Sequence, residues 1–76
     1  METFVIQGDS ITLAQAVKAV GLADSGGQAK HLVRSGKVTV NGAVEVQPGR
    51  KLHPGDRFGG EAAQWLVSRQ SGPGSA

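Results

Sequence analysis

The sequence predicts a small α+β domain built around a single hydrophobic core. Two segments combine helical spacing of apolar residues with a capping-box pair, and an Asn-Gly pair lies between two valine-rich runs. Two Pro-Gly pairs then mark turns in the second half of the chain. A chain of 76 residues has no material for a second core, so we expect one domain over residues 1–69.

A short strand and a helix are the first predicted elements. Residues 3–7 are rich in β-prone side chains, and a turn sequence follows them. A helix is predicted over residues 13–20, because Thr12 and Gln15 have capping-box spacing and the apolar residues of the segment fall on one face. Gly21 stands where a left-handed C-terminal cap is expected. This helix is predicted to be mainly structural.

The second predicted helix carries the candidate functional face. Ser25 and Gln28 repeat the capping-box spacing at its start, and Gly36 closes it. Its predicted buried stripe consists of Ala29, Leu32 and Val33. At about 100° per residue, three other side chains project from the opposite face. They are those of Lys30, His31 and Arg34.

Asn41-Gly42 predicts a β-hairpin between residues 38–40 and residues 44–46. A strict two-residue loop would send the valines of the second run to the opposite face from those of the first. A three-residue loop, or a bulge at Gly42, would place all four valines on one face. Because a single small core needs one buried face, we predict the odd-length loop.

Two turns and a last strand complete the predicted domain. Pro48-Gly49 and Pro54-Gly55 each predict a turn in which the glycine takes a positive φ. Leu52 and Phe58 are predicted core anchors near these turns. Residues 61–68 fit both helical and strand spacing, and we predict a strand.

Basic residues are concentrated in one part of the chain. Residues 28–58 hold six basic residues against two acidic ones, a net charge of +4, whereas the remainder carries −2. This asymmetry favours a polyanionic partner. Gly26 and Gly27, at the start of the second helix, leave backbone N–H groups open to an anion, and Lys30 and Arg34 extend the positive surface.

Each of these features also has a plain structural interpretation. Two glycines at a helix start can simply ease a tight turn, and cations on an exposed helix face are more often a solvated surface. His31 and His53 fit ordinary surface histidines, and Asn41 is first of all a turn residue. The combination of all these features in one short segment favours the functional interpretation.

Catalysis finds little support in the sequence. The absence of cysteine excludes disulfides, thiolate chemistry and Cys-based zinc sites, and it fits a reducing compartment. The chain has no P-loop, and neither histidine has a nucleophile at motif spacing. We expect a non-enzyme without metal or cofactor. No signal-peptide pattern or membrane-spanning apolar run occurs, so we expect a cytoplasmic protein, with residues 70–76 as a disordered tail.

The segment from Ser25 to Gly42, followed by Pro48 to Leu52 and Pro54 to Asp56, resembles the RNA-binding domain named after small-subunit ribosomal protein S-four. The resemblance covers residues 11–58 as the motif core. An added strand at each end is similar to the stand-alone bacterial YbcJ-like branch. The resemblance implies an α+β fold in which a helix-turn-helix pair, the alpha-L RNA-binding motif, packs on a small, mostly antiparallel twisted sheet.

The same resemblance implies a non-catalytic, monomeric protein that binds structured RNA, either rRNA or tRNA, with the ribosomal subunit as one expected partner. Many members have arginine after the capping serine, where this chain has Gly26, so backbone N–H groups would replace a side-chain contact. The predicted RNA-binding residues are Ser25, Gly26, Gly27, Gln28, Lys30, His31, Arg34, Lys37, Asn41, Arg50 and Lys51.

Two alternative functions stay open at this point. A protein-interaction module of the ubiquitin-like sulfur-carrier type would fit the hairpin and the mixed β segment, but such carriers need a C-terminal Gly-Gly and this chain ends Gly74-Ser75-Ala76. An accessory subunit of an RNA-modifying enzyme would bind RNA only together with a catalytic partner.

Overall fold

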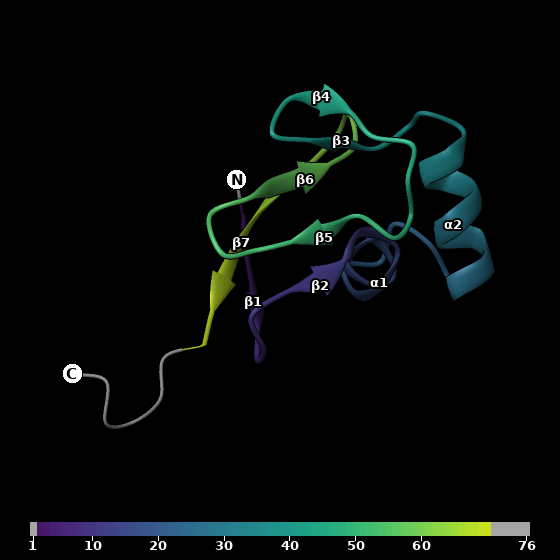
Figure 1. Ribbon diagram of the computed structural model, residues 1–76. Coiled ribbons are helices and arrows are strands. Elements are labelled where there is room, and N and C mark those ends of the chain that lie inside the picture. Colours follow the sequence, from purple (N-terminus) through teal and green to yellow (C-terminus); the bar gives the residue numbers. More distant parts are fainter. Residues whose placement is uncertain (1, 71–76) are drawn as a thin grey trace.

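A computed structural model describes residues 2–70 of the chain (Figure 1). These residues form two helices and seven strands. The elements are β1 (Glu2–Ile6), β2 (Ile11–Thr12), α1 (Leu13–Ala19), α2 (Gly26–Arg34), β3 (Thr39–Val40), β4 (Ala43–Val44), β5 (Lys51–Leu52), β6 (Arg57–Gly59) and β7 (Gln64–Arg69). The predicted tail beyond Gln70 lies outside the described residues.

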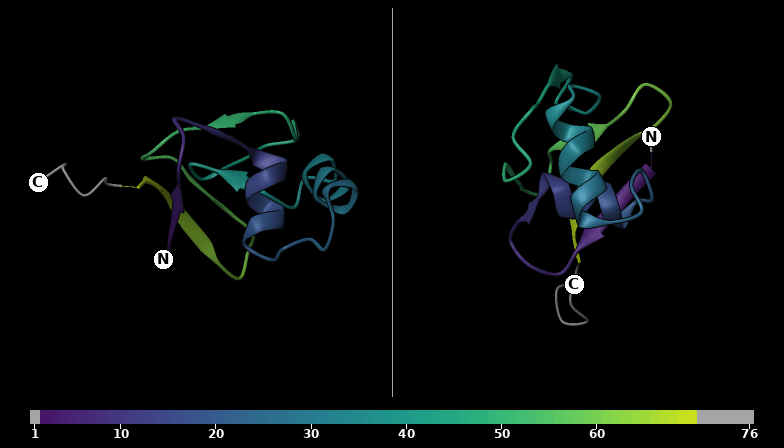
Figure 2. Two further views of the ribbon diagram at one scale, coloured as in Figure 1. Left: turned by 90° about the horizontal axis from the view of Figure 1, so that it is seen from below. Right: turned by 90° about the vertical axis from the view of Figure 1, so that its right-hand side faces the viewer.

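The main sheet has the strand order β1-β7-β6-β3-β4, and β2 and β5 form a separate antiparallel pair. Only the β1–β7 pair is parallel among the described pairs. The α+β class and the mostly antiparallel sheet are therefore confirmed, and so is a strand near residues 61–68. Both helices lie at one end of the molecule, and α2 lies farther from β1 and β7 than α1 does (Figures 1 and 2).

One hydrophobic core joins the helices to the sheet. The largest fully buried side chains are those of Phe58, Leu13, Leu52, Val17, Val33, Val38 and Val67. The Phe58 ring packs edge-on against Phe4, with 5.9 Å between ring centroids, and stacks on Trp65 at 5.7 Å. Leu52 and Phe58 are thus confirmed as core anchors. The three aromatic rings form one contact chain across β1, β6 and β7, where the sheet meets the core.

The predicted odd-length hairpin loop is wrong. Val40 pairs with Ala43, so Asn41-Gly42 forms a strict two-residue turn with positive φ at both positions, 53° and 86°. Two left-handed residues match the twist of adjacent strands, which favours this tight turn. The valines after the turn point away from the core, and Val44 and Val46 are 61% and 51% exposed. The core is formed without these two valines, by residues of both helices, β6 and other strands.

Local helix signals were predicted more accurately. Thr12 and Gln15 form the expected capping box of α1, with both side-chain bonds at 3.2 Å. Gly21 adopts a positive φ of 86°, as expected of a left-handed cap. Of the two turn glycines, Gly55 has the predicted positive φ, 99°, and Gly49 does not. The carbonyl groups on either side of Gly49, those of Pro48 and Arg50, face α1 and accept hydrogen bonds from its first two N–H groups.

That contact fixes the loop before β5 on the start of α1. The N–H of Leu13 donates to the carbonyl of Arg50 at 2.8 Å, and the N–H of Ala14 donates to the carbonyl of Pro48 at 3.0 Å. The first turn of α1 is therefore saturated by the protein itself. This leaves α2 as the helix whose start can receive a ligand.

Candidate nucleic-acid interface

The start of α2 carries two backbone N–H groups without an acceptor in the part of the chain that the structure describes, those of Gly26 and Gly27. The Ser25 hydroxyl accepts from the N–H of Gln28 at 3.1 Å, as predicted for an N-cap. In a capping box the Gln28 side chain would accept from the N–H of Ser25. Here its Oε1 accepts from the N–H of the preceding residue, Asp24, at 3.0 Å. Two donors therefore point out of the helix end, where its dipole is positive.

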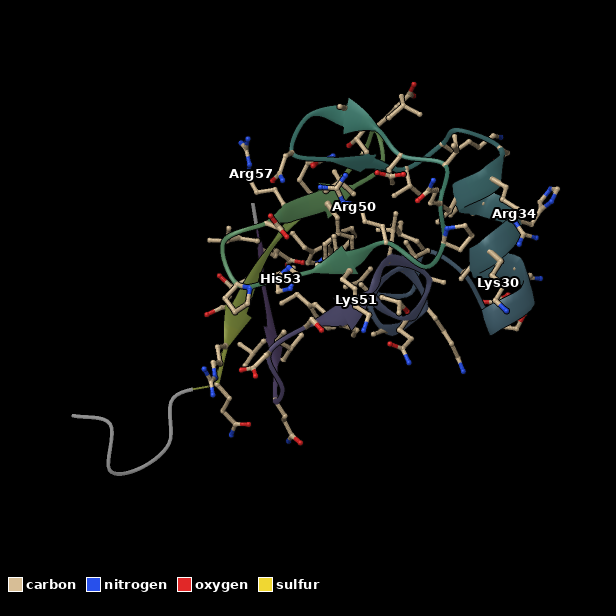
Figure 3. All side chains as sticks on the ribbon, viewed as in Figure 1. Lys30, Arg34, Arg50, Lys51, His53 and Arg57 are labelled. Carbon is tan, nitrogen blue, oxygen red and sulfur yellow. The ribbon has the colours of Figure 1, made fainter. Side chains whose placement is uncertain are left out.

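Lys30 and Arg34 project from α2 into solvent (Figure 3). Within residues 2–70 neither side chain takes part in an ion pair. The opposite side of the helix is buried through Ala29 and Val33, which fixes the orientation of the exposed face. We call Lys30 and Arg34 the α2 stripe. Lys37 is exposed just after the helix and continues the positive surface.

Arg50 is less available than the α2 stripe. Its guanidinium donates to Glu45 at 2.7 Å, and this bond is the main cause that lowers the pKa of the Glu45 carboxyl. The pair leaves little net charge at that point of the surface. Lys51 is exposed on β5 and forms no ion pair within residues 2–70. Of the two predicted loop cations, Lys51 is the one free to meet an anion.

The side chain of Asn41 is engaged within the protein. Its Nδ2 donates to the Asp56 carboxylate at 3.1 Å, and its Oδ1 accepts from the N–H of Arg57 at 2.9 Å. The same carboxylate accepts from the N–H of His53 at 2.8 Å, and this bond is the largest cause that lowers the Asp56 pKa. Asn41 therefore ties the hairpin to the turn at residues 53–56.

Figure 3 shows how the cations are spread over the molecule. Lys30 and Arg34 lie at one end, Arg50 and Lys51 lie near the middle of the view, and Arg57 lies at the end remote from α2. Sequence reasoning placed Arg57 in the basic segment but not in the site. Its position on β6 beside the Asn41 turn follows from strand pairing, which no local pattern revealed.

Open surface also lies beside α2, and sequence reasoning missed it. A pocket forms where α2 meets the connection from α1, and it is lined by Leu22, Ala23, Gly27, Gln28, His31 and Leu32. Three of these residues, Gly27, Gln28 and His31, belong to the predicted site. The signal available in the sequence was an apolar residue, Leu22, in the connection between the two helices.

Residues 2–70 contain no cluster of three or more His, Asp or Glu side chains placed to hold a metal ion. Neither of the two helices in this range is long and apolar enough to cross a lipid bilayer.

Comparison with known protein families gives an independent result. A family model described as the S4 domain matches residues 4–68, which is most of the chain. The match extends beyond the predicted motif core of residues 11–58 and includes most of β1 and most of β7. A search of curated proteins gave no match. S4 domains are in general RNA-binding modules and typically lack catalytic activity. The match covers most of the chain and agrees with the helix pair and the sheet, so the chain belongs to the S4 domain family.

Proposed function

We propose that this protein binds structured RNA, such as rRNA or tRNA, through the start of α2, the α2 stripe, Lys37 and Lys51. The observation that carries the proposal is the adjacency on one helix of two amides and two cations that have no partner among residues 2–70. In the same proposal the protein is a cytoplasmic monomer that performs no chemistry, and ribosome-associated RNA is among its targets.

Electrostatics favours a phosphate backbone as the ligand of this surface. Lys30 and Arg34 are four residues apart, and like charges at this spacing destabilise an isolated helix by about 0.2–0.5 kcal/mol. A phosphate between them removes the repulsion and releases counterions. The amides of Gly26 and Gly27 add hydrogen-bond donors at the positive end of the helix dipole. These contacts read backbone position and shape, as recognition of folded RNA requires.

The test begins with the RNA that crosslinks to the protein in cells, followed by titration of that RNA at several salt concentrations. If about four phosphates are contacted, log K falls with log salt at a slope of roughly −3 to −4. The Lys30→Ala/Arg34→Ala variant should bind more weakly and have a slope shallower by about 2.

The matched control is Lys18→Ala/Arg69→Ala, which removes the same charge from outside residues 28–58. It should change the slope far less. A flat salt response of the natural chain, or equal weakening by the two double variants, contradicts the proposed surface. Loss of the bound RNA when a co-purifying protein is removed would instead support the accessory-subunit alternative.

A further inference from the structure

The pocket beside α2 has a mixed lining, and Gly27 is the only lining residue that the proposed phosphate contacts also use. Its volume is about 430 Å³, within the range of small-molecule sites. Leu22, Ala23 and Leu32 form the apolar part, and Leu22 is 36% exposed. Gln28 and His31 provide the polar part. An exposed apolar recess with two polar groups at its side is suited to a flat ligand with apolar faces and polar edges.

Helical geometry places this pocket next to the α2 stripe. The buried side of α2 is marked by Ala29 and Val33. At about 100° per residue, Lys30 and Arg34 lie to one side of that direction, and Gln28 and Leu32 lie to the other. His31 points away from the buried side, between the two surfaces. A ligand that contacts the stripe with its charged part can therefore reach the pocket with its uncharged part.

The polar groups of the pocket are oriented and available. The Oε1 of Gln28 is fixed by the N–H of Asp24 at 3.0 Å, which leaves its Nε2 as a donor toward solvent. The imidazole of His31 is exposed and has no hydrogen-bond partner within residues 2–70, so it is available to a ligand. Unstacked bases in RNA loops and bulges are bound in this way, by stacking on rings such as histidine and by hydrogen bonds to their edges.

We propose that this pocket receives a single unstacked nucleobase of the bound RNA. The inference rests on the proposed function, because the phosphates that flank the base are expected to lie on the α2 stripe. Charge complementarity favours a nucleotide over a protein side chain here. Every nucleotide brings an anion next to its base, and the pocket opens beside Lys30 and Arg34, which form no ion pair within the described part of the chain.

The test compares two RNA duplexes that differ in one base. Both contain a single bulged nucleotide, but in one of them the bulged position is abasic, so the length and the charge of the backbone are the same. The natural chain should bind the duplex with the bulged base about tenfold more tightly, the size of effect that burying one base on a protein gives.

Gly27→Leu fills the pocket, and Gly26→Leu is its matched control. A Cβ at Gly27 meets only the Ser25 hydroxyl, at 3.9 Å, and a Cβ at Gly26 meets nothing within 4 Å, so both variants should fold. Both cover α2 amides and lower the affinity for every RNA. Only Gly27 lines the pocket, so only Gly27→Leu should abolish the tenfold difference between the duplexes.

The outcomes separate this inference from the proposed function. Equal, salt-dependent binding of the two duplexes by the natural chain overturns the base pocket and leaves the phosphate surface standing. A difference that persists in Gly27→Leu also overturns it, because the base then binds elsewhere. Loss of a protein partner in Gly27→Leu, with the difference unchanged, assigns the pocket to that partner instead. Failure to bind any RNA overturns both proposals.

Discussion

Replacing Gly26 and Gly27 together by alanine should stabilise the protein and weaken its binding of RNA. Both glycines lie in the first turn of α2, and neither has a positive φ. A methyl group has room at both positions, since the nearest atom is the Ser25 hydroxyl at 3.9 Å from a Cβ at Gly27. Alanine is favoured over glycine by about 0.5–1 kcal/mol per position in a helix interior, and the same preference, at or below that size, is expected in the first turn. The melting temperature should rise by about 4–8 °C per kcal/mol in a domain of this size.

Binding should change in the opposite direction. The added methyl groups shield the two amides that have no acceptor among residues 2–70. A hydrogen bond to a charged group contributes about 1.5–3 kcal/mol, so losing one amide–phosphate bond lowers the affinity about tenfold or more. Thermal unfolding followed by circular dichroism and RNA titration at one fixed salt concentration measure the two effects. A variant that is stabilised but binds RNA as tightly as the natural chain would refute the role of the amides.

Three further predictions concern the fold that presents this surface. Gly59→Ala should destabilise the domain by about 1–3 kcal/mol in urea unfolding, because the added Cβ would lie 2.2 Å from the Ala63 carbonyl oxygen. Gly60→Ala is the control and should be nearly neutral, because its Cβ would lie 3.7 Å from the nearest atom. Equal unfolding midpoints of the two variants would contradict this prediction. Asn41→Gly keeps the positive φ but loses two side-chain hydrogen bonds, so the free energy of unfolding should fall by about 1–3 kcal/mol while RNA affinity changes little. A large loss of affinity with an intact fold would return Asn41 to the interface. The lowered pKa of Asp56 means that the native state favours its carboxylate, so this contribution to stability is present near neutral pH and is lost as pH falls below about 4. Asp56→Asn should therefore flatten the pH dependence of the unfolding midpoint. An unchanged pH dependence would show that the hydrogen bond from the N–H of His53 to Asp56 does not contribute to stability.

Much of the helical part could be predicted because its signals are local. The caps of α1 and α2 depend on residues three apart, and the sequence alone identified Thr12, Gln15 and Ser25 in these roles. The α2 stripe follows from the same reasoning, since its spacing and the buried stripe fix the exposed face. One local prediction for the helices was wrong, the partner of the Gln28 side chain, which accepts from the N–H of Asp24.

The sheet and the loop part of the site depend on distant contacts, which local patterns do not contain. The hairpin register was predicted from the need to bury all four valines, but Phe58 and the helices fill the core without Val44 and Val46. The engagement of Asn41 by Asp56, fifteen residues away, followed only from the pairing of β3 with β6. Glu45 likewise reduces the availability of Arg50 from five residues away.

The parallel pairing of β1 with β7 has a consequence for how the protein is made. Glu2 lies beside Trp65 and Ile6 beside Arg69, so the first strand of the domain meets its partner only when the last strand exists. During translation the chain emerges from its N-terminus, and β1 leaves the ribosome with its hydrogen-bonding edge unsatisfied. Such non-local closure slows folding, because a long loop must be ordered before the contact forms. The helix pair can assemble early, whereas the sheet is completed only after synthesis has passed Arg69.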